Sequence, residues 1–283
     1  MTILQAIILG IVQGLTEFIP VSSTAHLVFA ARAVSLYGGM DKTLQAEQTT
    51  ATIAVIQLGT LLAVLIYFAT DIIKILRAFI FDHLAIFQGR TKPGAPKLSH
   101  DAWLGWLVII GSLPVGIVGL LFKKHIEGTF TKNLWVIATM MIVVGLLMMI
   151  AEFVGKRSRG MDQLGVRDAL AVGCAQVLAL IPGSSRSGST IMAGLFAGET
   201  RETAARFSFL LSIPAIAASG LLELKEAVAK IPTDSYLALA VATVVSGVVG
   251  YASIWFLLRF LRTHSTGVFI VYRLIVALLI LVA

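Results

Sequence analysis

Long apolar stretches, separated by short polar connections, run along the whole chain. A membrane-spanning helix needs about 20 mostly apolar residues. The stretches that meet this requirement are 49–68, 102–122, 133–154, 203–223, 235–258 and 265–283. This pattern predicts an all-α integral membrane protein with six transmembrane helices.

Two further apolar regions, 3–36 and 166–198, are interrupted midway by a proline and small polar residues. The first break begins at Pro20 and reads Pro-Val-Ser-Ser-Thr-Ala-His; the second begins at Pro182 and reads Pro-Gly-Ser-Ser-Arg-Ser-Gly-Ser-Thr. Each arm has about 10 to 16 residues, too few to span a bilayer. We therefore expect two re-entrant helical hairpins, whose irregular backbone is buried in protein or lines a wet cavity.

The two broken regions also resemble each other. The sequence Gly-x-x-Gln-x-Leu precedes the proline of both breaks, starting at Gly10 and at Gly173. The chain thus divides into two repeats, about 1–155 and 160–283, each a hairpin followed by three spans. Three crossings are an odd number, so the second hairpin enters from the opposite face. Residues 1–283 are predicted to form a single membrane domain with an inverted-topology repeat.

Composition supports a membrane location. Charged residues make up 13% of the chain and the mean hydropathy is +0.93, whereas a soluble domain carries about 25% charged residues. This excludes a cytosolic enzyme and a disordered chain, and it argues against nucleic acid as a partner despite the net charge of +7. The single Cys174 excludes an intramolecular disulfide.

The basic residues predict the orientation. Thirteen of the 22 lie in the connections on one face, which are 69–101, 155–167, 199–206 and 259–264, and seven lie on the other face. By the positive-inside rule the first face is cytoplasmic. Both termini and the mouth of the first hairpin are then predicted to face outward.

Two basic residues stay within the membrane: Arg186 in the second break and Arg273 in the last span. A charge at this depth is costly and indicates a functional site. Glu17, at the first break, is the acidic counterpart. The alternative is that Glu17 and Arg186 form a structural ion pair between the hairpins, which leaves Arg273 and the hydroxyl groups of the breaks unexplained.

Hydroxyl side chains are concentrated in the breaks. Seven lie within them, with Thr190 following directly: Ser22, Ser23, Thr24, Ser184, Ser185, Ser187 and Ser189. One serine alone would be explained as a helix N-cap. Two helix N-termini, with this many donors and two guanidinium groups, instead predict a cradle for a polyanion such as a phosphate group.

A histidine accompanies these groups. His26 lies three residues after Ser23, so both project from the first turn of one helix. Gln13 and Glu17 are four residues apart and share a face of the preceding arm. A lone histidine on a membrane helix is usually a packing residue, but beside a serine, a carboxylate and a phosphate cradle it indicates chemistry.

These motifs resemble a known family. Gln13-x-x-x-Glu17, the segments 20–26 and 182–190, and the pair Tyr272-Arg273 are similar to the signatures of bacterial undecaprenyl-diphosphate phosphatases of the bacitracin-resistance type. The resemblance extends over the whole chain in the length, order and spacing of the motifs. Many members have Glu where Gln13 stands, and Ala25 replaces the usual Gly before the histidine.

The resemblance implies a function and a location. The implied reaction is hydrolysis of the terminal phosphate of undecaprenyl diphosphate, which recycles the lipid carrier of peptidoglycan synthesis. The implied location is the bacterial inner membrane, with a pocket open toward the periplasm. The expected partners are a polyprenyl diphosphate substrate, membrane lipids and, as a further hypothesis, a second copy in a homodimer.

The residues suggest roles in such a reaction. We expect Ser23 to be the nucleophile, with His26 and Glu17 positioning and activating it. The runner-up arrangement has His26 as the nucleophile and Ser23 as a phosphate ligand, and the sequence does not separate the two because both residues lie on the same helical turn. The residues expected to bind the diphosphate are Arg186, Arg273, Ser22, Thr24, Ser185, Ser187, Thr190 and Gln13. A loosely bound divalent cation such as Mg²⁺ is expected with the substrate.

Transport is the alternative function. Inverted repeats with broken helices are typical of transporters, and the cradle could bind a polyprenyl phosphate lipid for flipping. The Ser23, His26 and Glu17 set favours an enzyme, because anion binding alone does not require it.

Overall fold

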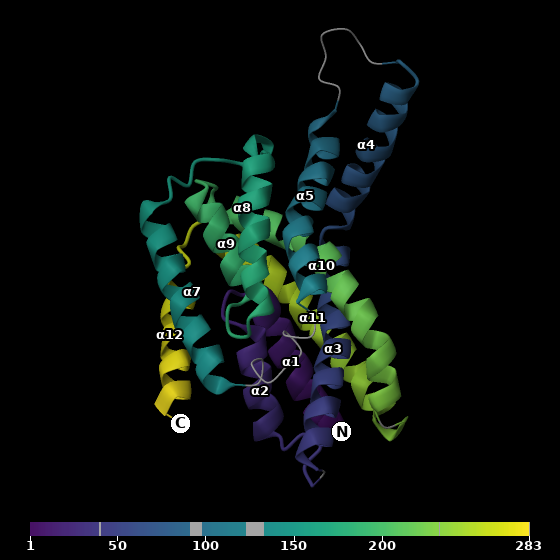
Figure 1. Ribbon diagram of the computed structural model, residues 1–283, viewed down its shortest axis with the longest axis vertical. Helices are drawn as coiled ribbons and strands as arrows, with labels where there is room; N and C mark the ends of the chain where they lie inside the picture. Colours follow the sequence, from purple (N-terminus) through teal and green to yellow (C-terminus); the bar gives the residue numbers. More distant parts are fainter. Residues whose placement is uncertain (40, 91–97, 123–132, 232, 283) are drawn as a thin grey trace.

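The computed structural model describes residues 1–39, 41–90, 98–122, 133–231 and 233–282. Five lysines that enter the predicted orientation lie outside these ranges, namely Lys92, Lys97, Lys123, Lys124 and Lys132. The described part of the chain is helical between short connections and forms no strand (Figure 1). This confirms the predicted all-α class.

The α-helices are α1 Ile3–Phe18, α2 Ser23–Ala33, α3 Lys42–Tyr67, α4 Ala69–Phe87, α5 His100–Leu121, α7 Leu134–Val154, α8 Val166–Val177, α9 Arg186–Phe196, α10 Arg201–Lys230, α11 Tyr236–Leu261 and α12 Gly267–Val282. Short 3-10 turns are η2 Met161–Gln163, η3 Leu178–Leu180 and η4 Thr233–Ser235.

Four helical segments of the described chain are long and apolar enough to cross a membrane: Glu47–Tyr67 of α3, and the whole of α5, α7 and α11. They make the chain a multi-pass membrane protein. The other two expected spans, 203–223 and 265–283, correspond to α10 and α12. The second of these helices has only 16 residues, fewer than a perpendicular crossing needs.

Both predicted breaks interrupt helices. The first lies between α1 and α2, and the second between η3 and α9. The residues before α2 and α9, Ser22 and Ser185, have φ of 76° and 67°, a left-handed conformation that is uncommon for residues other than glycine and recurs at functional sites. In Figure 1 the α8–α9 arm enters from the end opposite to the chain termini, and α1–α2 from the end where they lie.

Each broken arm packs on a helix from the other half of the chain: α1 runs along α11, and α8 along α5. Small residues allow close approach of the backbones. A Cβ on Gly10 would lie 2.6 Å from the carbonyl oxygen of Ala242, and a Cβ on Gly173 would overlap the carbonyl of Gly111. The arms are therefore held rigidly, without room for larger side chains.

Replacing Gly173 with alanine tests this close packing. The added methyl group meets main-chain atoms of Gly111, so Gly173→Ala is expected to destabilise the fold by about 1–3 kcal/mol, read as a lower thermal unfolding midpoint in detergent. Gly116→Ala, on the open face of α5 where nothing lies within 4 Å of a Cβ, is the control. Equal midpoints for both variants would contradict the packing.

An unpaired carboxyl group is buried between α9 and α10, outside the spans. Glu199 is fully buried, and neither of its carboxyl oxygens has a hydrogen-bond partner. Burial raises the pKa of Glu199 to about 7; the charge of Asp168 adds to this rise, and that of Arg159 opposes it. The group is thus substantially protonated near neutral pH.

This carboxyl group predicts a pH-dependent stability. Its pKa is higher in the folded than in the unfolded chain, so the stability present at low pH falls as the pH rises from about 4.5 through about 7. Glu199→Gln does not titrate, so between about pH 5 and about pH 8 its free energy of unfolding should rise relative to the wild type, by on the order of 3 kcal/mol at most. The measurement is the difference between the two thermal unfolding midpoints at each pH. The same substitution at Glu202, which is partly exposed and bonded to Arg262, should show no such growing difference.

Candidate functional site

The two breaks are joined by a buried ion pair. Arg186 Nη2 donates to Glu17 Oε1 at 3.0 Å, and the two side chains are 12% and 5% exposed. Glu17 also accepts from Gln13 Nε2 at 3.0 Å and from Gln57 Nε2 at 3.5 Å. The structure thus brings Gln13, Glu17 and Arg186 together. The pair of Glu17 with Arg186 is the ion pair between the hairpins that the sequence offered as an alternative to a functional site.

Arg273 is placed differently from Arg186. It is fully buried in α12, and its guanidinium donates to main-chain carbonyl oxygens. The acceptors are Met141 at 3.0 Å, Pro20 at 3.4 Å, and Gly183 and Ser184 at 3.1 Å each. These carbonyls come from both breaks and from α7. Arg273 therefore holds the two breaks together, and its predicted contact with the diphosphate stays a prediction.

The hydroxyl groups of the second break serve mostly internal contacts. Ser185 Oγ accepts from the N–H of Gly188 at 3.1 Å, as a helix cap. Ser187 Oγ donates to Ile19 O at 3.4 Å and so reaches the first break. Thr190 Oγ1 lies 2.6 Å from Ser208 Oγ of α10. Thr190 therefore lies in the contact between α9 and α10.

His26 has partners at both ring nitrogens. Its Nδ1 lies 2.8 Å from Ser22 O, and its Nε2 lies 2.8 Å from the hydroxyl of Tyr272 on α12. The two rings stack with 5.6 Å between centroids and 12° between planes. In the free protein the ring is thus bonded neither to Ser23 nor to Glu17, so the predicted set of three is not assembled by direct hydrogen bonds.

The first turn of α2 is the open side of the site. Ser23 is partly exposed and Thr24 is exposed, while Ser22 is buried. The first N–H groups of α2 and α9 have no intrahelical acceptor, and a helix N-terminus carries positive potential. The first turn of α2 thus presents free N–H groups that suit an anion.

Several buried polar atoms near the breaks are unpaired. Nine buried side-chain nitrogen or oxygen atoms of the described residues lack a hydrogen-bond partner, and four of them belong to the site: Gln13 Oε1, Ser22 Oγ, Arg186 Nη1 and Ser189 Oγ. An unpaired buried polar atom costs about 1–3 kcal/mol. Arg186 in particular donates from Nη2 to Glu17, while its Nη1 is buried without a partner.

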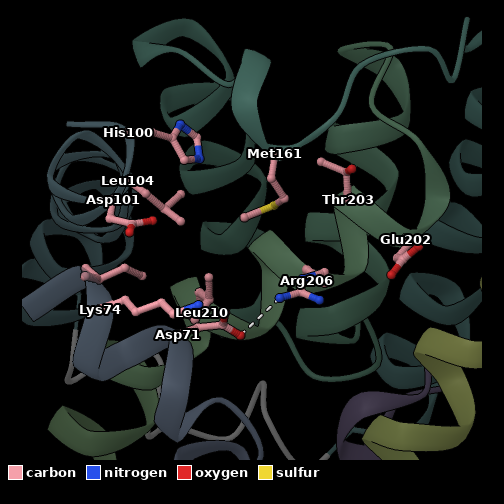
Figure 2. Close-up of a pocket in the computed structure, with 11 residues that line it drawn as sticks. Asp71, Lys74, His100, Asp101, Leu104, Met161, Glu202, Thr203, Arg206 and Leu210 are labelled. Carbon is pink, nitrogen blue, oxygen red and sulfur yellow. Dashed lines mark hydrogen bonds and ion pairs between the residues drawn. The ribbon is translucent and has the colours of Figure 1, made fainter. Parts of the chain in front are cut away.

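A charged cavity of about 330 Å³ lies elsewhere, between α4, α5 and α10. Figure 2 shows Arg206 bonded to Asp71, a contact of 3.0 Å, with Lys74, Asp101 and His100 lining the side of the cavity to the left of this pair. None of the predicted site residues lines this cavity.

Three residues of the site were missed by sequence reasoning. Gln57 of α3 contacts Glu17, and Thr60 of α3 contacts Gln13. The sequence feature that could have revealed them is a pair of polar residues three positions apart, on one face of an otherwise apolar span. Tyr272, which binds His26, was noted only as the neighbour of Arg273. Its ring is 46% exposed, and no sequence spacing indicates a contact with α2.

The comparisons with known proteins identify the family of the chain. A family described as bacitracin resistance protein BacA matches residues 6–279. The chain belongs to the BacA family. The match covers both broken arms and the helix that carries Arg273, so the motifs quoted above lie within it.

Several relatives of the chain are named undecaprenyl-diphosphatase. An undecaprenyl-diphosphatase of Syntrophobacter fumaroxidans is 53% identical over 275 residues, covering 97% of this chain and 95% of that protein. Undecaprenyl-diphosphatases of Chloroherpeton thalassium and Mycolicibacterium gilvum are 47% and 46% identical, covering 99% and 100% of this chain and 96% of each relative. These relatives are named as hydrolases and not as transporters.

The carbonyl contacts of Arg273 predict a structural effect. Lysine keeps the charge but cannot reach carbonyls on several sides at once, so Arg273→Lys should lose about 1–3 kcal/mol and lower the thermal unfolding midpoint. Arg262→Lys, at the exposed pair with Glu202, is the control and should change the midpoint little. A midpoint of Arg273→Lys equal to that of the wild type would refute this role.

Proposed function

We propose that this chain is an undecaprenyl-diphosphate phosphatase that releases the terminal phosphate and leaves undecaprenyl phosphate for peptidoglycan synthesis. Its membership of the BacA family and its identity to named undecaprenyl-diphosphatases support the reaction. The observation in the molecule that carries the proposal is Arg186, held by Glu17 between two helix N-termini with Nη1 unpaired. Removal of the carrier's phosphate also accounts for the bacitracin-resistance role of the family.

The cradle suits a diphosphate with a lipid tail. Phosphoryl transfer requires mainly positioning and neutralisation of charge. Arg186 Nη1 and the N–H groups at the start of α2 and α9 would bind the phosphate oxygens, and Ser22 and Thr24 lie beside them. The prenyl chain stays in the bilayer, where it remains solvated by lipid.

In the proposed reaction Ser23 Oγ attacks the terminal phosphorus, and His26 takes the proton from the hydroxyl. The bond from that phosphorus to the bridging oxygen breaks, and undecaprenyl phosphate leaves. Water then attacks the phosphoserine, releases inorganic phosphate and restores the hydroxyl. Glu17 holds Arg186 and, with Gln13, orients it toward the phosphate.

His26 as nucleophile is the alternative within the same function. Its Nε2 would form the bond to phosphorus, and Ser23 would bind a phosphate oxygen. The contact between His26 and Tyr272 leaves both schemes open, because each needs the same ring nitrogen.

A divalent cation fits the site only together with substrate. No group of three His, Cys, Asp or Glu side chains that could hold a metal occurs in the described part of the chain. Gln13 Oε1 is buried and unpaired beside Glu17, so these two residues could supply oxygen ligands to Mg²⁺ shared with the diphosphate. Such an ion would neutralise phosphate charge.

We further propose six spans and two re-entrant hairpins, in inverted repeats of about 1–155 and 160–283. The reciprocal packing of α1 on α11 and α8 on α5 supports this arrangement. The charge distribution of the connections favours an inner-membrane protein with its termini and active-site opening toward the periplasm. A homodimer stays a prediction.

Phosphate release from a long-chain prenyl diphosphate in detergent tests the function. The wild type should release inorganic phosphate, and Arg186→Ala should reduce kcat/KM at least about 100-fold by removing charge stabilisation. Arg167→Ala, an exposed arginine on α8, is the matched control. Release by the wild type no faster than the background, with or without added Mg²⁺, would refute the enzyme.

Acid quenching during turnover distinguishes the two nucleophiles. An acid-stable phosphoryl adduct on the α2 peptide identifies Ser23, and an acid-labile adduct identifies His26. If Ser23→Ala and His26→Ala both turn over normally and no adduct is trapped, both covalent schemes are wrong.

A further inference from the structure

The hydroxyl of Tyr272 occupies the reactive nitrogen of His26. Ser22 O can only accept a hydrogen bond, so its 2.8 Å contact places a proton on His26 Nδ1. In the neutral ring Nε2 then has a free lone pair, and the Tyr272 hydroxyl at 2.8 Å is the donor. The same nitrogen is the base or the nucleophile in both schemes above.

Tyr272 is well placed to orient this ring. The residue after it, Arg273, is bonded to carbonyls of both breaks, so this turn of α12 is fixed relative to α2. The Tyr272 ring stacks almost parallel to that of His26. Hydrogen bonds at both nitrogens and the stack together define the tautomer and the plane of the imidazole.

We propose that Tyr272 is a positioning residue, which holds His26 with Nε2 unprotonated in the free enzyme and gives up this nitrogen when the diphosphate binds. This inference rests on the proposed phosphatase function. As a donor the hydroxyl can bond only an unprotonated Nε2, and a protonated ring would require it to turn and accept, so the donor arrangement favours the neutral imidazole before substrate arrives. The exposed edge of Tyr272 lets the ring move without disturbing the buried contacts of Arg273.

Tyr272→Phe tests the proposal because it removes the hydroxyl and keeps the ring. Without the donor, His26 takes up a proton more readily, so the acid limb of the profile of kcat/KM against pH should move upward by about 0.5–1 pH unit. Tyr251→Phe is the control, since Tyr251 has nearly the same exposure, 45%, and its ring contacts the tilted ring of Tyr67 rather than a histidine. A uniform loss of rate at every pH, or an unchanged profile, would overturn the proposal.

A second measurement does not depend on turnover. Diethyl pyrocarbonate modifies unprotonated imidazole nitrogens, and mass spectrometry of the peptides gives the rate at each histidine. At high pH, where the ring is neutral in both proteins, modification of His26 should be several-fold faster in Tyr272→Phe than in the wild type, with the exposed His100 as internal standard.

The two measurements separate the two proposals. If the wild type releases no phosphate but His26 is modified faster in Tyr272→Phe, the phosphatase function is refuted and the hydrogen bond from Tyr272 to His26 is supported. If the wild type releases phosphate but His26 is modified at equal rates in both proteins, the role of Tyr272 is refuted and the phosphatase function is supported.

Discussion

The structure depends on how the interrupted backbone of the two broken arms is satisfied in apolar surroundings. A carbonyl without a partner is costly in a bilayer, because no water is present to bond it. Arg273 solves this with one side chain, since its planar group of donors reaches carbonyls of both breaks and of α7. The irregular segments therefore have a fixed geometry, and the helix N-termini are held where a ligand can meet them.

The two arginines within the membrane differ in how much of their bonding capacity remains. Arg273 is directed at main-chain oxygens and builds the site, whereas Arg186 is half engaged by Glu17 and retains a buried nitrogen. A buried ion pair is weak evidence for stability, but it can keep a cationic group oriented until an anion arrives. Glu17 in turn is held by Gln13 and Gln57. In the proposed function this arrangement preorganises the charges for a phosphate-bearing substrate.

Much of the organisation could be predicted from the sequence. Proline followed by small polar residues marked both breaks. The pairing of Glu17 with Arg186 could also be expected, because an acidic and a basic side chain within the membrane stabilise each other. The partners of Arg273 could not be predicted. A charged side chain within the membrane must be compensated, but the sequence does not say whether main-chain carbonyls or a bound phosphate compensate it. The contact between His26 and Tyr272 could not be predicted either, since it depends on the register between α2 and α12. The same limit applies to Thr190, which helical periodicity alone cannot assign to the cradle or to α10.

The bond from Arg273 to Pro20 joins residues 253 positions apart, and this has a consequence for biosynthesis. A ribosome adds about 5–20 residues each second, so the first break emerges many seconds before the side chain that completes it. Until then the first arm must wait in the membrane with its carbonyls bonded to water, lipid headgroups or an insertion factor. Insertion of the last helix thus completes the fold. A chain that stops before this helix would leave the carbonyls of both breaks without the donors of Arg273.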